Sequence, residues 1–157
     1  MIQKRLTAAL LIAAMGLICS CAKDDEPSFD KYRLECYEYL EQNAMREEVI
    51  TTLSGLQYEV LREGTGKQPT LSDMVRCHYK GWLIDGTVFD SSYDKGGSIV
   101  FPLNGVIEGW KEGLQLMKAG AMYRFYIPYT LGYGPYQQGD IPPYSALIFE
   151  VELIEVL

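Results

Sequence analysis

The segment NGVIEGWKEGLQLMKAG, residues 104–120, has the pattern of an amphipathic helix, because its polar and apolar residues separate onto two sides at helical spacing. The polar side consists of Glu108, Lys111, Glu112, Gln115 and Lys118. The apolar side consists of Val106, Gly109, Trp110, Gly113, Leu114, Leu116 and Met117, with Ile107 at its edge. A glycine inside a helix costs about 1 kcal/mol relative to alanine. We therefore expect Gly109 and Gly113 to let sheet backbone approach the helix closely, which leaves the indole of Trp110 open.

Alternating residues on both sides of this helix predict the strands of that sheet. Val75, Cys77 and Tyr79 face one way, and the residues between them face the other. Residues 56–61 read as a first strand, and alternation recurs over residues 122–127 and 147–153. Because only one short helix interrupts these strands, the pattern predicts an α+β fold in which a twisted antiparallel sheet covers the helix.

Residues 1–20 are typical of a secretory signal. Lys4 and Arg5 precede an apolar run over residues 8–18, which is short for a transmembrane helix. The run ends in LICSC, where small or apolar residues before Cys21 resemble a bacterial lipobox. We expect Cys21 to carry acyl chains such as palmitate and to become the new N-terminus. An ordinary signal peptide that happens to contain cysteines is the alternative.

Residues 21–28, CAKDDEPS, are predicted to be an acidic tether. Their Lys-Asp-Asp-Glu is also similar to an acidic export signal that sends some lipoproteins to the cell surface. Removing residues 1–20 takes away two basic residues and no acid, so the net charge changes from −7 to −9. This acidity argues against nucleic acid as a partner. We expect a lipid-anchored protein of the outer membrane that faces the periplasm or the cell surface.

Residues 29–50 are predicted to form a helical extension, because apolar side chains recur there at steps of three and four. The stripe consists of Phe29, Tyr32, Cys36, Tyr39, Leu40 and Asn43. It docks either on the main domain, which is the commoner outcome, or on a second copy of the chain in a homodimer. The spacing of Cys36 and Cys77 demands no disulfide, and the strand pattern favours a buried free thiol at Cys77.

Aromatic residues dominate the candidate chemistry, with 12 Tyr, 5 Phe and 2 Trp. His78 is the only histidine, and the sequence has neither a CxxC pair nor a GxxxxGK[ST] loop, so we expect no metal and no cofactor. An apolar pocket forms if five aromatic residues from five segments converge: Tyr79, Phe89, Trp110, Tyr133 and Phe149. Asp90 would be its carboxylate. The alternative is that these residues are only core. The Gly-, Pro- and Tyr-rich loop over residues 129–145 indicates a functional segment.

Three motifs in this order resemble the FKBP-type peptidyl-prolyl cis–trans isomerases. They are VRCHYKGWLIDGTVFDSSY (75–93), VIEGWKEGLQLMKAG (106–120), and YTLGYG (129–134) followed by IPPYSALIFEVELIEV (141–156). SGLQYEVLREGTG, residues 54–66, is similar to the domain entry of the macrophage-infectivity-potentiator-like branch. The resemblance implies an isomerase domain over residues 51–157, with a five-stranded antiparallel sheet wrapped around one short helix.

The resemblance also implies a role for each pocket residue. Trp110 would be the floor under the prolyl ring, and Ile141 would line the rim. The walls would be Tyr79, Phe89, Val106, Ile107 and Phe149. The Ile107 N–H and the Tyr133 hydroxyl would each bond a substrate carbonyl. Asp90 would lie beside the rotating amide, where it either orients Tyr79 or contacts the distorted carbonyl.

Two departures from the family pattern bear on substrate preference more than on activity. Ile99 stands where many members have an aromatic wall residue. Lys95 lies near a position that is often Arg, a partner of Asp90, and the change would lose a bidentate contact.

The implied function is acceleration of Xaa–Pro bond rotation in polypeptide substrates, without a cofactor. Two alternatives remain at this point. One is a non-catalytic module or chaperone that holds proline-containing segments in the same pocket. The other is a structural surface lipoprotein whose aromatic residues are only core.

Overall fold

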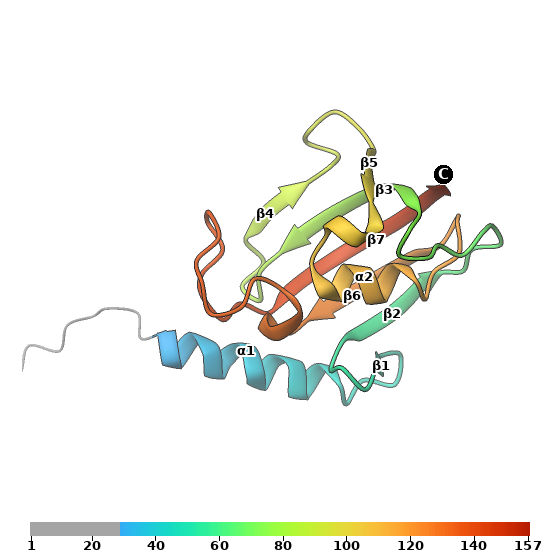
Figure 1. The fold of residues 1–157 in the computed structure, drawn as a ribbon. Coiled ribbons are helices and arrows are strands. Elements are labelled where there is room, and N and C mark those ends of the chain that lie inside the picture. Colours follow the sequence, from blue (N-terminus) through green and yellow to red (C-terminus); the bar gives the residue numbers. More distant parts are fainter. Residues whose placement is uncertain (1–28) are drawn as a thin grey trace, which may run out of the picture.

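A computed structural model describes residues 29–157 (Figure 1). Its elements are α1 (Phe29–Asn43), β1 (Ile50–Thr51), β2 (Gln57–Arg62), β3 (Met74–Trp82), β4 (Val88–Ser91), β5 (Ile99–Pro102), η1 (Leu103–Gly105), α2 (Glu108–Leu114), β6 (Met122–Ile127), η2 (Tyr129–Leu131) and β7 (Leu147–Val156). The predicted signal, the lipobox with Cys21 and the acidic tether lie outside the described residues.

All strand pairs are antiparallel, in the order β1-β2-β6-β7-β3-β4, and β5 pairs with the first part of β3. The predicted α+β architecture is confirmed, but the sheet has seven strands where the resemblance implies five. The difference comes from short strands. β1 has two residues, and the long β3 pairs along one edge with both β5 and β4.

The predicted alternation is confirmed where the sheet covers α2. Val75, Cys77 and Tyr79 of β3 are buried on the side of α2. In β7, Leu147, Phe149, Val151 and Leu153 are buried on the same side. Together with Leu114 and Met117 they form one apolar core between the sheet and α2.

The helix in residues 104–120 is shorter than its pattern predicts, because α2 spans only Glu108–Leu114. Before it, the chain forms the 3-10 turn η1 and then extended backbone at Val106 and Ile107. After it, Leu116 and Met117 donate to carbonyls three residues back, so the chain continues as tight turns. Met117 stays fully buried, and Leu116 is instead exposed.

Gly109 and Gly113 let α2 pack closely on β6, as expected. The atoms that approach them belong to side chains of the sheet, however, and not to its backbone. A Cβ atom at Gly109 would lie 2.6 Å from Cγ2 of Ile127. A Cβ atom at Gly113 would lie 2.6 Å from Cε1 of Phe125. Both distances are far inside van der Waals contact, so a larger residue at either position would push α2 away from β6.

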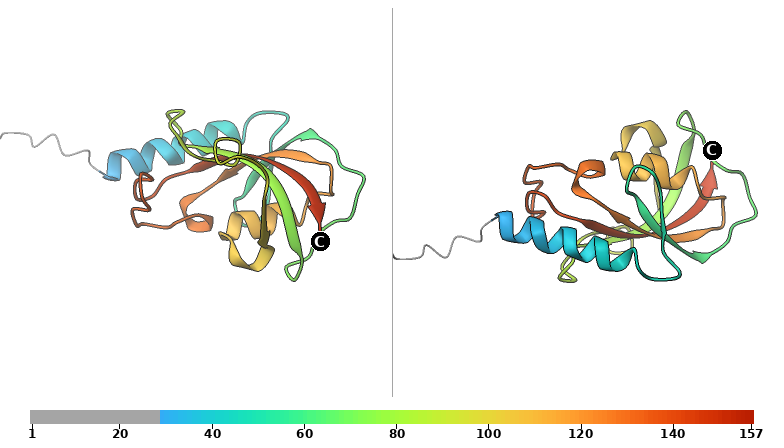
Figure 2. Two further views of the ribbon diagram at one scale, coloured as in Figure 1. Left: turned by 90° about the horizontal axis from the view of Figure 1, so that it is seen from above. Right: turned by 90° about the horizontal axis from the view of Figure 1, so that it is seen from below.

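Helix α1 packs on the opposite face of the sheet from α2 (Figure 2). Docking on the main domain is therefore the observed outcome for its stripe, except at Phe29, which is 50% exposed. The helix ends at Asn43 and does not extend to residue 50. The Asn43 side chain is buried and donates to Gln57 of β2 at 2.8 Å. The chain then turns, which brings Arg46 to the sheet.

The contact between this turn and the sheet is polar and centres on the buried Glu59 of β2. Arg46 pairs with its Oε1 atom, and Arg124 Nη1 lies 3.0 Å from its Oε2 atom. The Tyr126 hydroxyl lies 3.2 Å from the same Oε2. Arg124 also pairs with Glu150 at 2.9 Å, which extends the network to β7. We call Arg46, Glu59, Arg124, Tyr126 and Glu150 the outer network.

Cys36 and Cys77 are both buried and unpaired with one another. Cys36 lies in α1 and Cys77 in β3 on the side of α2, so the sheet separates them. Burial raises the pKa of the Cys77 thiol to about 12, which keeps it protonated. The prediction of a buried free thiol at Cys77 is confirmed.

Candidate active site

A pocket of about 430 Å³ opens between the start of α2 and the sheet. All ten residues that the sequence predicts line it: Tyr79, Phe89, Asp90, Ile99, Val106, Ile107, Trp110, Tyr133, Ile141 and Phe149. Phe101 and Gly105 line it as well and are missed by the sequence analysis. Phe101 follows Ile99 by two residues in β5, so strand alternation was a usable signal for it. Gly105 has no side chain and gives no such signal.

Trp110 forms the floor of the pocket and is held on three sides by aromatic rings. Its ring meets Tyr79 and Phe149 edge-to-face at centroid distances of 5.3 and 5.1 Å, both at 84°. Phe101 lies against it at 5.6 Å. Edge-to-face pairs of this kind each add about 0.5–1.5 kcal/mol beyond simple burial. These three rings therefore hold the indole in place at the floor of the pocket.

Gly81 of β3 makes space for two of the aromatic walls. A Cβ atom there would lie 2.6 Å from Phe149 and 2.8 Å from Phe89. These two rings meet edge-to-face at 5.3 Å. The absence of a side chain at residue 81 thus lets Phe89 and Phe149 pack over β3 and face the cavity together.

Asp90 is the only charged residue among the pocket-lining residues. The Tyr79 hydroxyl donates to its Oδ2 atom at 2.8 Å. Lys95 Nζ lies 2.7 Å from the Oδ1 atom of Asp90. The two atoms form an ion pair, but their geometry is not that of a hydrogen bond. Desolvation raises the pKa of Asp90, but Lys95 and Tyr79 outweigh it and hold the pKa below its usual value. Asp90 is therefore ionised at neutral pH and orients Tyr79, as one of the two predicted roles requires.

Two hydrogen-bond donors face the apolar walls. Ile107 caps the start of α2, where its carbonyl accepts from Trp110 and Lys111 at 3.0 and 3.1 Å. Within residues 29–157, its own N–H has no acceptor, so it is free for a ligand. Burial, followed by the nearby Asp90 charge, raises the pKa of Tyr133. Its hydroxyl therefore keeps its proton and can donate.

His78 takes no part in this pocket. It points to the other side of β3, where its Nδ1 lies 3.0 Å from Ser92 Oγ and its ring stacks on Tyr93 at 4.6 Å. The prediction that strand alternation turns His78 away from Tyr79 is confirmed.

Comparisons with known proteins agree with this geometry. A family model described as FKBP-type peptidyl-prolyl cis-trans isomerase matches residues 65–154. A second model, described as the domain amino terminal to FKBP-type peptidyl-prolyl isomerase, matches residues 11–60. The first match alone covers more than half of the chain and contains every pocket residue.

Individual relatives give the same result. The chain is 51% identical to the FKBP-type 22 kDa peptidyl-prolyl cis-trans isomerase of Escherichia coli, over 82% of this chain and 63% of that protein. It is 50% identical to the peptidyl-prolyl cis-trans isomerase Mip of Coxiella burnetii, over 75% of this chain and 52% of that protein.

A solved structure extends the likeness to the fold. The crystal structure of FkpA from Escherichia coli matches with a TM-score of 0.79 and 43% identity, over 81% of this chain and 60% of that one. The chain thus spans between 52% and 63% of the length of these three proteins. With these matches and the pocket described above, the chain belongs to the family of FKBP-type peptidyl-prolyl cis-trans isomerases.

Proposed function

We propose that the protein is a peptidyl-prolyl cis–trans isomerase that accelerates rotation about Xaa–Pro bonds in polypeptides. One observation carries the proposal: an aromatic pocket, floored by Trp110, whose single charged residue is already engaged by Lys95 and Tyr79. Such a pocket takes an apolar ring, and its chemistry is limited to binding and electrostatics.

Amide rotation needs no more than that. Resonance sets a barrier of about 18–20 kcal/mol, and unaided exchange of Xaa–Pro isomers takes tens to hundreds of seconds. The twisted amide has lost conjugation and is less charge-separated than either planar form. An apolar pocket that excludes water therefore favours the twisted amide over the planar one, which lowers the barrier.

The pocket residues supply the orientation. Trp110 and the rings against it seat the prolyl side chain. The Ile107 N–H and the Tyr133 hydroxyl fix substrate carbonyls on either side of the bond that turns. Asp90 holds the Tyr79 hydroxyl at 2.8 Å, so this wall is preorganised before the substrate arrives.

The test is cis–trans exchange in a short Xaa–Pro peptide, followed by NMR exchange or a protease-coupled assay. We expect faster exchange with the wild-type protein, and lower rates with Tyr133→Phe and with Asp90→Ala. Tyr136→Phe is the matched control, because Tyr136 lies in the same loop and its side chain is 74% exposed. Equal exchange with and without the wild-type protein would refute the proposal. Peptide binding without acceleration would instead identify a non-catalytic proline-binding module.

The same proposal includes an outer-membrane lipid anchor at Cys21, supported by the lipobox-like LICSC. No helix between residues 29 and 157 is long and apolar enough to span a bilayer. Mass spectrometry of the N-terminal peptide would detect acyl chains on Cys21. Cys21→Ala should move the protein out of the membrane fraction, whereas Cys19→Ala should not. Protease treatment of intact cells then distinguishes the periplasmic side from the cell surface.

A homodimer through α1 also belongs to the proposal. While one side of α1 packs on the sheet, Phe29, Leu34 and Tyr37 are 50%, 55% and 60% exposed. Light scattering after size-exclusion chromatography gives the mass in solution. A dimer that Leu34→Glu converts to a monomer would support it, and a monomeric wild type would refute it.

A further inference from the structure

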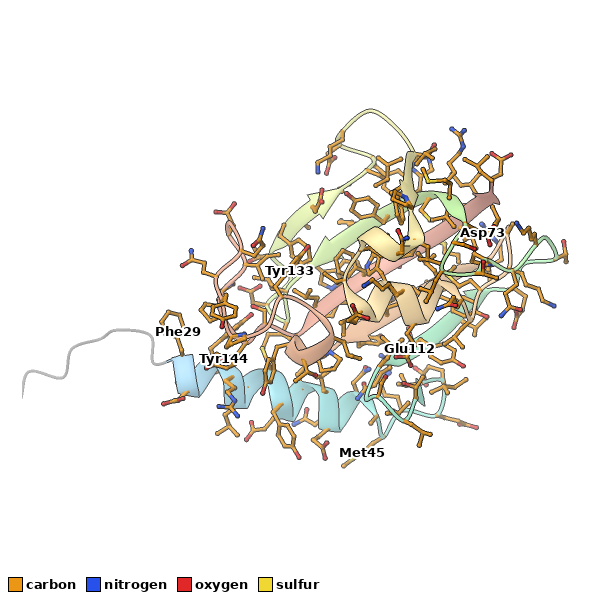
Figure 3. The ribbon with its side chains drawn as sticks, viewed as in Figure 1. Phe29, Met45, Asp73, Glu112, Tyr133 and Tyr144 are labelled. Atoms are coloured by element: carbon orange, nitrogen blue, oxygen red, sulfur yellow. The ribbon has the colours of Figure 1, made fainter. Side chains whose placement is uncertain are left out.

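Helix α1 contacts the loop that carries two of the pocket residues. This loop, residues 128–146, connects β6 to β7 and contains Tyr133 and Ile141. Arg33 of α1 lies over the rings of two residues near the ends of the loop, 5.8 Å from the Tyr129 centroid and 5.1 Å from the Tyr144 centroid. Figure 3 shows Tyr144 beside the first turns of α1.

The two rings are arranged to receive a cation. Tyr129 and Tyr144 meet edge-to-face at 5.3 Å and 75°, and the guanidinium of Arg33 contacts both. Within residues 29–157, the exposed Arg33 forms no salt bridge, and the two rings are the partners that the structure shows for its guanidinium. Tyr144 is also the only non-glycine residue in this part of the chain with a positive φ, at 62°. A tyrosine holds that conformation only where its surroundings enforce it.

From these two tyrosines, backbone hydrogen bonds lead directly to the active site. The Tyr144 N–H donates to the Gly134 carbonyl at 3.1 Å, and the Gly134 N–H donates to the Tyr129 carbonyl at 2.9 Å. Both polar groups of Gly134 are therefore fixed by the residues that Arg33 contacts. Gly134 follows Tyr133, whose side chain lines the pocket. The position of Tyr133 thus depends on Tyr129 and Tyr144.

A second set of contacts from α1 reaches the other loop residue in the pocket. Tyr32 hydroxyl lies 3.4 Å from Ser145 Oγ, which donates to the Pro142 carbonyl at 2.7 Å. Pro142 follows the pocket residue Ile141. The Ala146 N–H contacts Cys36 Sγ at 3.4 Å, which fastens the end of the loop to the same helix. Two independent routes therefore run from α1 to the rim of the pocket.

We propose that Arg33 is a positioning residue for Tyr133: by clamping Tyr129 and Tyr144, helix α1 holds the loop in the conformation that presents the Tyr133 hydroxyl to the substrate. This inference rests on the proposed isomerase function. It predicts that a residue on the face of the sheet opposite α2 controls part of the activity of the pocket.

The test compares Arg33→Met, Arg33→Lys and Lys31→Ala in the full-length protein. Methionine keeps the length of the side chain and removes the charge, whereas lysine restores the cation. Lys31 is the control on the same helix, with a side chain 79% exposed and only a loose contact of 3.7 Å to Glu35. We expect kcat/KM to fall about fivefold in Arg33→Met, the factor that a partly exposed cation–π contact corresponds to. Arg33→Lys should recover part of the loss, and Lys31→Ala should match the wild type.

A double-mutant cycle distinguishes positioning from general loss of structure. In a Tyr133→Phe background, Arg33→Met should lower kcat/KM no further, because the hydroxyl that Arg33 positions is already absent. An equal fivefold loss in both backgrounds would overturn the proposal. So would unchanged kcat/KM in Arg33→Met.

Amide hydrogen exchange gives a readout that needs no catalysis. The N–H groups of Gly134 and Tyr144 should exchange faster in Arg33→Met than in Lys31→Ala, while the amides of β7 stay equally protected. Equal exchange at these two amides would overturn the proposal. An inactive wild-type protein refutes the isomerase function alone, because the exchange measurement still decides whether Arg33 holds the loop.

Discussion

The two faces of the sheet hold their helices by different means. On one face, α2 packs through glycines and aromatic rings, and the only charged group that lines the pocket is Asp90. On the other face, the end of α1 and the turn after it are attached through polar groups, with the buried Glu59 at the centre of the outer network. The pocket for an apolar ring is thus built into a tightly packed, apolar wall. A helix added to the outer face can use directional polar contacts instead.

The largest effect is expected from Gly113→Val, which breaks the apolar face. The new side chain would begin 2.6 Å from Phe125, so α2 must move away from β6. Overpacking of this kind costs about 1–3 kcal/mol, and the glycine-sized gap places this variant at the upper end. Urea unfolding should show the loss, together with reduced isomerase activity. Glu108→Val is the control on the exposed side of α2, and an equal loss there would mean that the β-branched residue and not the close contact is responsible.

Glu59→Gln weakens the outer network and should have the next largest effect. The neutral amide removes the charge that pairs with Arg46 and Arg124, whose side chains are 40% and 30% exposed. We expect a loss of about 2 kcal/mol in urea unfolding, the range for hydrogen bonds to charged groups. Glu48→Gln is the matched control, because Glu48 also pairs with Arg46 but is 57% exposed. If both variants lose the same stability, burial of Glu59 is irrelevant.

The pH dependence of activity tests the role of Asp90, the one charged residue among those that line the pocket. Since the pKa of Asp90 is lower in the folded protein than in the unfolded chain, its stabilising contacts are present above about pH 4 and are lost as the pH falls through its folded pKa. Isomerase activity should therefore be level between about pH 5 and 8 and decline only in stronger acid.

Lys95→Met should raise the pKa of Asp90, because desolvation is then opposed only by Tyr79 and the neighbouring backbone. The acid limb of the activity profile should move upward. Lys67→Met, which removes an exposed partner of Asp73 elsewhere, should leave the profile unchanged. An identical acid limb in the wild type and Lys95→Met would show that Asp90 does not govern it.

Arg76→Ala should have the smallest effect on the free energy of unfolding, because it removes an exposed ion pair and not a buried one. Arg76 pairs with Glu155 at 3.3 Å, and their side chains are 40% and 53% exposed. Exposed pairs of this kind contribute about 0–1 kcal/mol and are screened by salt. We expect a change below about 0.5 kcal/mol in urea unfolding. A loss as large as that of Glu59→Gln would show that burial does not separate the two kinds of ion pair.

The side of the sheet that faces α2 is easier to predict from the sequence than the side that faces α1, and the reason is physical. Strand alternation and helical spacing report burial against a core, so Val75, Tyr79 and Trp110 were accessible to it. The aromatic content suggested Phe89, Tyr133 and Phe149, and the family resemblance added the pocket roles of the aliphatic residues, but neither pointed to Phe101 or Gly105. The end of α1 at Asn43 depends on a hydrogen bond to Gln57, 14 residues away, and no local period encodes such a contact.

The length of α2 also differs from what the apolar spacing predicts. The apolar spacing of residues 104–120 continues past Leu114, and Met117 is buried as the pattern predicts. The backbone, however, leaves the helix there, because its next hydrogen bonds reach back three residues and Gly120 donates to Leu153 of β7. Periodicity records which residues are inside, and it does not record which backbone conformation puts them there.

The place of β7 in the sheet has a consequence for how the protein is made. β7 lies between β6 and β3, and it follows every other strand in chain order. Without it, β1, β2 and β6 on one side share no strand pairing with β3, β4 and β5 on the other. A nascent chain therefore cannot close this sheet, or form the wall at Phe149, until the ribosome has released β7. The two parts of the sheet can therefore join only after this last of the described strands has been made.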